Sequence, residues 1–286
     1  MQKGDNRPIG IFDSGIGGLT VLKEVWKWLP KENTIYFGDS GRMPYGTKSH
    51  DTIVDFSLQI TRFLESKNVK LLVIACNSAS AHSYEAVKNS TSIPVVEVIT
   101  PGAQKAVEET RNGKIGVIAT RATVTSGLYK EVMETEKRKA LSKHQNEKAL
   151  LHFSVTQKAC PLFVSLAEEG WWDHQITRLT AEEYLKEMTK ENIDTLVLGC
   201  THYPLLTDVI QSVMGEKTKL INAGESVAKR VLEILRAKGI ENDGNTPSEK
   251  LFFTSDDPLM FESQAAPFLG GGRPEGTKKI HIEEYG

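Results

Sequence analysis

The feature that most restricts the fold of this 286-residue chain is a recurring unit: a short apolar run, a turn of small or polar residues, and a helix. Apolar runs of this length alternating with helices are typical of buried parallel strands in α/β proteins. Such strands end at the same edge of a sheet. We therefore predict an α/β fold with apolar strands at residues 8–12, 34–37, 69–75, 94–99, 114–120 and 194–198.

The recurring unit also has an internal symmetry. A strand with a small polar turn and then a strand with a cysteine turn occur at residues 8–18 and 69–80, and again at 114–126 and 194–204. We interpret this as two pseudo-symmetric, Rossmann-like, three-layer α/β/α domains with the active site in the inter-domain cleft. The chain is long enough for two cores of ordinary size. The expected first domain is residues 1–99 plus 208–286, and the second is 100–207, with a hinge at residues 100–102.

Two cysteines follow apolar runs directly, Cys76 after residues 69–75 and Cys200 after residues 194–199. Ligands of open α/β sheets bind at this carboxyl edge of the strands. Asn77 and Ser78 are N-cap candidates for the next helix, whose dipole favours a thiolate at Cys76. Three widely spaced cysteines do not form a disulfide framework, so we expect reduced thiols and a buried, small hydrophobic Cys160.

Asp13 also ends an apolar strand, and its carboxylate fits two interpretations, capping of the following glycine turn or a role in the site. Exposed N–H groups at the start of the next helix would suit an anion. The glycine pattern from Gly15 to Thr20 lacks the third glycine of a dinucleotide fingerprint, and the chain has no P-loop sequence. We therefore expect no nucleotide cofactor.

Charge and composition exclude several classes of protein. Lys+Arg 35 against Asp+Glu 37 gives a net charge of -2, and no basic run suggests nucleic acid as a partner. No apolar segment approaches the roughly 18 residues of a membrane helix, and no signal peptide is recognised, so a cytoplasmic protein is expected. The charged residues 137–148 are interpreted as a solvated face, and the tail at 270–286 as mobile.

Four segments together resemble the signature segments of bacterial glutamate racemases, within the aspartate/glutamate racemase superfamily. These are Gly10 to Thr20, Tyr36 to Asp39 with Pro44-Tyr45-Gly46, Ala75 to Ser80, and Gly199 to Leu205. The resemblance spans about residues 8 to 254. It implies a cofactor-independent isomerase that interconverts L- and D-glutamate and supplies D-glutamate for peptidoglycan, and hence for cell-wall biogenesis and cell shape.

The resemblance also implies roles for individual residues. Cys76 is expected to take the α-proton from D-glutamate, assisted by Asp13, and Cys200 to take it from L-glutamate, assisted by His202. Glu168 is an accessory candidate, and no metal is expected. The residues expected to bind substrate are Asp13, Ser14, Tyr45, Gly46, Asn77, Ser78, Thr123, Thr201 and His202. The family leaves open a homodimer and activation by a cell-wall precursor.

Other interpretations of the same residues remain. A cysteine at a strand end is more often packing than catalytic, and the other six histidines are assigned no role. Cys76, Cys200, His202 and Asp13 would also form a chemically sensible zinc shell, which predicts a zinc-dependent hydrolase. A noncatalytic sensor of a small anion is a third possibility, and an aspartate racemase is the nearest alternative within the superfamily.

Overall fold

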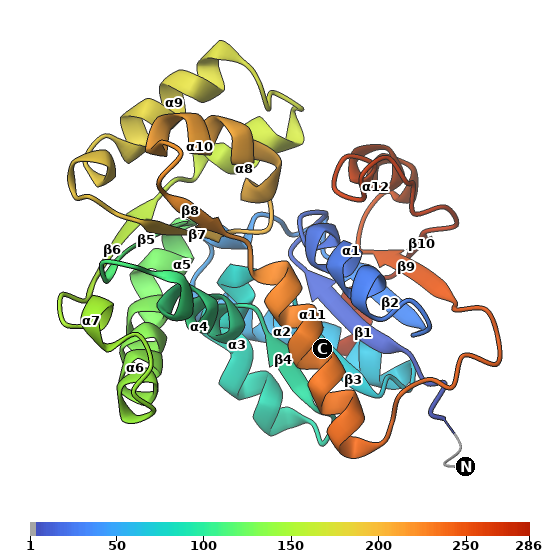
Figure 1. Ribbon diagram of the computed structural model, residues 1–286. Coiled ribbons are helices and arrows are strands. Elements are labelled where there is room, and N and C mark those ends of the chain that lie inside the picture. The colour runs from blue at the N-terminus through green and yellow to red at the C-terminus, as the bar shows by residue number, and fades with distance from the viewer. Residues whose placement is uncertain (1–3) are drawn as a thin grey trace. The chain divides into compact units, whose positions relative to one another are not determined.

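The chain, seen in a computed structural model that describes residues 4–286, contains two sheets in which every described strand pairing is parallel (Figure 1). It divides into two compact units. The first unit comprises the chain up to Val98 together with Gly224–Gly286, and the second comprises Ile99–Ala223. The predicted α/β class is confirmed.

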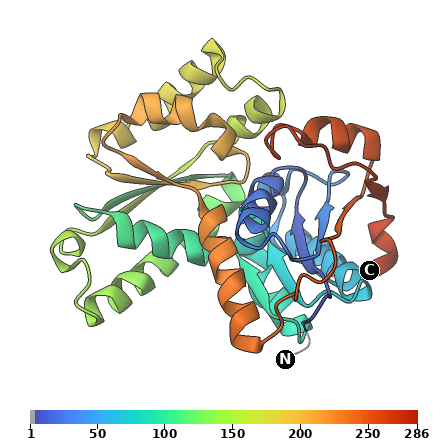
Figure 2. The ribbon, with the colours of Figure 1, turned by 45° about the vertical axis from the view of Figure 1, so that its right-hand side comes forward.

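The first unit has a six-stranded sheet in the order β10-β9-β2-β1-β3-β4. Its central strands are buried along their whole length, because almost every residue in them is apolar. Helices α1 and α11 lie on one face of this sheet, and α2 and α3 lie on the other (Figures 1 and 2). The bounds are β1 Ile9–Asp13, α1 Leu19–Trp28, β2 Thr34–Gly38, α2 His50–Ser66, β3 Leu71–Ile74, α3 Asn77–Ser90, β4 Val95–Glu97, α11 Ala223–Lys238, β9 Lys250–Thr254, α12 Pro258–Ala265 and β10 Lys278–Lys279.

The second unit has a four-stranded sheet in the order β6-β5-β7-β8. One apolar core joins its strands to α8, α9 and α10, and includes Phe163, Leu185, Leu196 and Ile210. The strand β6 was not predicted, since its residues are polar and only partly buried. The bounds are α4 Ile99–Glu109, β5 Lys114–Ala119, α5 Arg121–Ser126, α6 Leu128–Ser142, α7 Glu147–Leu150, β6 Ser154–Ala159, α8 Leu162–Glu168, α9 Gln175–Leu185, β7 Thr195–Gly199, α10 Thr207–Met214 and β8 Lys219–Ile221.

The two sheets share one strand order. In the first unit the consecutive strands β1 to β4 are arranged β2-β1-β3-β4, and in the second β5 to β8 are arranged β6-β5-β7-β8. The first strand of each set is therefore central, and the third lies beside it. Cys76 follows the third strand of its set, and Cys200 follows the third strand of the other. The predicted pseudo-symmetry is present in the topology.

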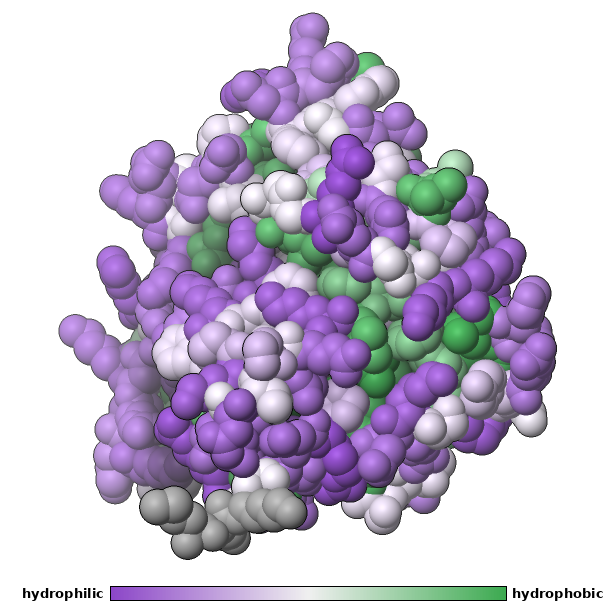
Figure 3. All heavy atoms as spheres, turned by 90° about the vertical axis from the view of Figure 1, so that its right-hand side faces the viewer, coloured by the Kyte–Doolittle hydropathy of each residue, from purple (hydrophilic) through white to green (hydrophobic). Residues whose placement is uncertain are grey.

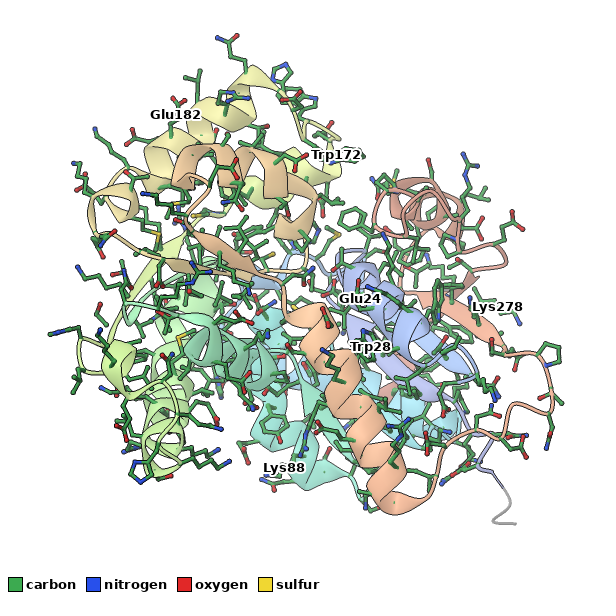
Figure 4. All side chains as sticks on the ribbon, viewed as in Figure 1. Glu24, Trp28, Lys88, Trp172, Glu182 and Lys278 are labelled. Carbon is green, nitrogen blue, oxygen red and sulfur yellow. The ribbon has the colours of Figure 1, made fainter. Side chains whose placement is uncertain are left out.

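The chain segment after Gly224 returns to the first unit through specific contacts. Lys229 of α11 lies 4.6 Å over the ring of Trp28 on α1, which is labelled in Figure 4. Lys70 forms a buried ion pair with Glu32, and its Nζ also donates to the carbonyls of Asp5 and Ile240, at 2.6 and 2.8 Å. This buried ammonium ties the start of the chain to the residues that follow α11.

The division between units differs from the predicted one at its second crossing. We expected residues 208–286 to rejoin the first domain, but the second unit continues to Ala223. The reason is pairing and packing: β8 pairs with β7, and α10 belongs to the apolar core of the second unit. The first crossing falls after Val98, and the expected hinge residues 100–102 lie inside α4.

The C-terminal tail is packed, contrary to the expectation of a mobile segment. Ile282 is fully buried, and the ring of Tyr285 contacts the ring of Phe63 at 5.4 Å between centroids. Arg62 also donates a hydrogen bond to the carbonyl of Tyr285. The charged segment 137–148 fits its interpretation, because it lies mainly on exposed parts of α6 and α7.

Hydrophilic side chains cover most of the face that Figure 3 shows, with hydrophobic side chains in areas between them. Large exposed apolar residues occur in both units, for example Leu259 on α12 and Leu179 on α9. Within residues 4–286, none of the helices is both long and apolar enough to cross a bilayer.

Candidate active site

The turn after β1 and the turn after β3 lie side by side, because these two strands pair with Phe12 opposite Ile74. Cys76 is buried, its thiol donates to Ser14 Oγ at 3.5 Å, and its sulfur accepts the Ala79 N–H at 3.5 Å. Asp13 is also buried, and its Oδ2 accepts the Gly15 N–H at 3.0 Å. We call Asp13, Ser14 and Cys76 the first cluster.

Cys76 is itself the N-cap of α3. The prediction that Asn77 or Ser78 would cap this helix is therefore wrong, since both are in its first turn. A sulfur at the N-cap faces the unpaired N–H groups and the positive end of the helix dipole, which stabilise a thiolate. The local sequence thus places the sulfur of Cys76 where negative charge is favoured.

The capping interpretation of Asp13 is confirmed by its bond from Gly15, but Asp13 also lies close to Tyr36. The Tyr36 hydroxyl donates to the Gly15 carbonyl at 2.8 Å. Burial raises the pKa of Tyr36 well above its usual value, and the nearby charges of Asp13 and Cys76 raise it further. Tyr36 therefore remains a neutral phenol that holds the glycine turn beside the first cluster.

The start of α1 does not have the exposed N–H groups that we expected. Leu19 and Thr20 are buried, and their N–H groups donate to the carbonyls of Ile16 and Gly17, each at 3.1 Å. A Cβ at Gly18 would lie 2.5 Å from Asp13 Cβ, so this position requires glycine. Close packing of the turn, rather than an open anion site, explains these residues.

Asp39 organises the loop that carries Tyr45 and Gly46. Its carboxylate accepts hydrogen bonds from Arg42 Nε at 2.8 and 3.0 Å, from Ser255 Oγ at 2.7 Å, and from the buried Tyr45 hydroxyl. Burial raises the pKa of Asp39, while Arg42, Tyr45 and Ser255 act in the opposite direction. The Asp39 N–H also donates to the Asp13 carbonyl at 3.0 Å, so this network supports the first cluster directly.

A second cluster lies at the carboxyl end of β7. Cys200 is buried, and its sulfur lies 3.8 Å from His202 Nδ1. On the other side of the ring, His202 Nε2 lies 2.9 Å from Glu168 Oε1 at the end of α8. We call Cys200, His202 and Glu168 the second cluster. Each ring nitrogen of His202 thus has a partner that can accept a hydrogen bond.

Electrostatics make His202 a cation. Burial alone would lower the pKa of His202, but its hydrogen bonds to Cys200 and Glu168 outweigh burial and raise the pKa to about 10. At neutral pH the imidazolium can donate from both nitrogens, to the Cys200 sulfur and to the Glu168 carboxylate. This arrangement favours negative charge on the sulfur.

The remaining predicted residues lie beside these two clusters. Asn77 and Ser78 follow Cys76 in α3, and Thr201 follows Cys200, all three being buried. Thr123 is fully buried in α5, with its hydroxyl 3.0 Å from that of Thr120. Because β5 pairs with β7, with Ala119 opposite Gly199, this threonine turn is at the same sheet edge as Cys200.

Cys160 behaves as predicted, as a buried small hydrophobe. It is fully buried in the core of the second unit, and burial raises the pKa of its thiol to about 12. Its carbonyl accepts the Tyr203 hydroxyl at 2.8 Å. This thiol therefore stays protonated at neutral pH.

Asp39, Tyr36 and Ser255 have no predicted role from the sequence. Asp39 carried a usable signal, since it comes directly after the buried strand β2, and Asp13 is the last residue of the buried strand β1. Tyr36 looks like any core aromatic in its strand, and Ser255 lies more than two hundred residues from Asp39 in the sequence. In the described part of the chain, no group of three or more His, Cys, Asp or Glu side chains is arranged to hold a metal ion.

Comparisons with known proteins agree on one family. Residues 9–231 match the Asp/Glu/Hydantoin racemase family. The glutamate racemase of Geobacter metallireducens is 48% identical over 265 residues, covering 93% of each chain. The crystal structure of a Francisella tularensis glutamate racemase in complex with D-glutamate matches with a TM-score of 0.88 at 37% identity, covering 98% of this chain and 100% of that one.

A second solved structure includes a further ligand. The Escherichia coli glutamate racemase, in complex with L-glutamate and the activator UDP-MurNAc-ala, matches with a TM-score of 0.75 at 30% identity. The match covers 96% of this chain and 98% of the other.

Proposed function

Because this chain belongs to the Asp/Glu/Hydantoin racemase family, we propose that it interconverts L- and D-glutamate with Cys76 and Cys200 as the two acid/base groups. The observation that carries the proposal is the position of these thiols. Each follows the third strand of an equivalent four-strand set, and each is buried among groups that favour its charged form.

Racemisation needs two groups because a proton must leave one face of the α-carbon and another must reach the opposite face. One cysteine is a thiolate and takes the α-proton, so that the C–H bond breaks and its electron pair stays on carbon. The other cysteine is a thiol and delivers its proton to the opposite face. In this proposal Cys200 deprotonates L-glutamate and Cys76 deprotonates D-glutamate, after which the charge states of the two thiols are exchanged.

Different groups assist the two thiols. Cys76 has the start of α3, the Ser14 hydroxyl and the adjacent Asp13, whereas Cys200 has the imidazolium of His202 with Glu168 behind it. General acid–base groups contribute most when they are held within hydrogen-bond reach of the groups that share their proton. No step needs a bound cofactor or a metal.

Substrate binding is proposed for Asp13, Ser14, Tyr45, Gly46, Asn77, Ser78, Thr123, Thr201 and His202. Hydroxyl, amide and backbone N–H groups of this set would hold the two carboxylates and the ammonium of glutamate. Since the Tyr45 hydroxyl already donates to Asp39, we assign the Tyr45-Gly46 contribution to the backbone of this loop.

The decisive experiment incubates the protein with L-glutamate in heavy water, with a reducing agent and without pyridoxal phosphate. We expect optical activity to decay and deuterium to appear at the α-carbon of the D-glutamate product. Folded protein that exchanges no α-hydrogen from either enantiomer, with and without UDP-MurNAc-Ala, contradicts the proposal. L-aspartate, run in parallel, tests the alternative substrate.

Two further measurements separate the alternatives that are not racemases. Stoichiometric zinc in the purified protein, lost together with activity on chelation, would favour the hydrolase interpretation. Binding of glutamate without exchange would favour an anion sensor.

The biological setting is also part of this proposal. We propose that the D-glutamate product enters peptidoglycan synthesis in the cytoplasm. Assays with and without UDP-MurNAc-Ala test whether this chain is activated as the Escherichia coli protein is. Analytical ultracentrifugation tests whether it forms a homodimer.

A further inference from the structure

Two histidines outside both clusters face each other on the first unit. His50 is the first residue of α2, and His82 lies in the second turn of α3. Their Nδ1 atoms are 3.2 Å apart, and their ring centroids are 5.4 Å apart with the planes at 69°. Sequence analysis gave neither residue a role, and the proposed racemisation does not use them.

The separation of the two nitrogens matches the edge of a metal coordination tetrahedron. With Zn–N bonds of about 2.0–2.1 Å, two nitrogens of a tetrahedral zinc centre are about 3.3 Å apart. Neutral imidazole is the commonest metal ligand in proteins and suits zinc, nickel and copper rather than magnesium or calcium. We propose that His50 and His82 bind one late first-row divalent cation, such as Zn²⁺, through their Nδ1 atoms.

The backbone around the pair is already fixed. Helices α2 and α3 pack against each other, and Ser49 caps α2 by accepting the Thr52 N–H at 3.3 Å. Two ligands held by two ordered helices need little rearrangement to bind a metal. His50 is exposed and His82 is partly exposed, so water can fill the other coordination positions.

The same features predict moderate affinity. Only two side chains are available, because the described residues include no group of three or more His, Cys, Asp or Glu side chains that is arranged to hold a metal ion. The start of α2 also carries the positive end of a helix dipole, which opposes a cation at His50. We therefore expect a site of micromolar rather than nanomolar affinity.

A metal at this pair would link two segments that support the first cluster. Helix α2 follows the loop with Tyr45 and Gly46, and α3 begins at its cap, Cys76. The two histidines are held together in the folded unit but not in the unfolded chain. Zinc should therefore bind the folded state more tightly and raise the melting temperature. The competing explanation is a simple imidazole hydrogen bond, which predicts no specific zinc binding.

The test is calorimetric titration with Zn²⁺ at pH 7.5. It uses a C76S/C200S background, so that the two thiols of the proposed mechanism cannot bind the metal. We expect one zinc per chain, with affinity reduced at least tenfold by H50Q and equally by H82Q. H144Q is the matched control, because His144 is an exposed histidine paired with Glu147 at 2.6 Å, and it should bind zinc like the background chain.

Two results would overturn the inference. One is a background chain that binds no zinc, and the other is H50Q and H82Q chains that bind it as H144Q does. Circular dichroism without metal verifies folding. Should either glutamine variant be misfolded, NMR of the histidine rings in the background chain decides, since zinc must shift the signals of two rings and leave the signal of His144 unchanged. Neither result depends on racemase activity.

Discussion

The first and second clusters each surround a buried cysteine thiol, but with different groups. Both place a buried cysteine after the third strand of an equivalent four-strand set. Around Cys76 the support is a helix start and a hydroxyl, neither of which carries a full positive charge. Around Cys200 the support is an imidazolium, which keeps its charge at neutral pH because the pKa of His202 is raised to about 10.

The difference shows which features of the site come from the fold and which from individual residues. The strand order puts a thiol at the carboxyl edge of each sheet, and the side chains nearby decide how its charge is stabilised. A mirror-image reaction on a chiral substrate requires a proton-transfer group for each face of the α-carbon. It does not require equal surroundings, because the protein is not its own mirror image.

The largest effect is expected from removing either thiol. C76A and C200A should each reduce racemisation by about 10³-fold or more, because each removes one of the two acid/base groups. C160A is the matched control and should retain activity, since the Cys160 thiol lies in the core and stays protonated. Measuring kcat/KM from both enantiomers tests this. A C76A or C200A chain of normal rate removes that thiol from the mechanism.

The next largest effect is expected from His202. H202N should lower kcat/KM by about 10²-fold, within the usual range for a general acid–base partner. The loss must be equal in both directions, since mirror-image substrates have an equilibrium constant of one, while the two kcat values can change unequally. Circular dichroism assays of each enantiomer measure this. A loss below about threefold would mean that the imidazolium does not assist Cys200.

Replacing Glu168 should lower the rate less than replacing His202, and it should also shift the pH–rate profile. E168Q replaces a charge-assisted hydrogen bond by a neutral one, a difference of about 1.4 kcal/mol or tenfold in rate. Because Glu168 helps raise the pKa of His202, E168Q should lower that pKa from about 10 and move the alkaline limb of the pH–rate profile to lower pH. A rate loss with an unmoved limb would mean that Glu168 acts only structurally.

His202 also predicts how stability depends on pH. Its pKa is raised in the folded protein, from 6.5 to about 10. The folded state therefore binds more protons between these values, so the stabilisation is fully present below pH 6.5 and is lost as pH rises through about 10. Urea unfolding of the parent should show this decline, and H202N should show less of it. Equal pH slopes for the two chains would contradict the assignment.

The smallest effects are expected from two buried tyrosines, one in each unit. Tyr36 donates to the Gly15 carbonyl, and Tyr203 donates to the Cys160 carbonyl, both at 2.8 Å. Y36F and Y203F should each lower the free energy of unfolding by about 1–2 kcal/mol, because a buried carbonyl loses its donor. Only Y36F should also lower kcat/KM, since its turn adjoins Asp13. Equal activity losses would remove this distinction between the clusters.

Much of the architecture was predictable from local pattern. Short apolar runs that end in a turn specified the central strands to within a few residues, because a buried parallel strand must be apolar throughout. The same pattern placed Asp13, Cys76 and Cys200 at strand ends. It did not reveal β6, whose residues are polar, or the packing of the tail around Ile282.

The sequence by itself determined the α/β class, the repeated succession of strands and turns along the chain, and the position of each thiol at a strand end, because these follow from periodicity over a few residues. Only the tertiary structure decided which groups surround the thiols. Glu168 reaches His202 from another helix, Ser255 reaches Asp39 from the far end of the chain, and Cys76 is its own helix cap. Such contacts depend on how strands and helices pack in space, and hydrophobic periodicity carries no information about that packing.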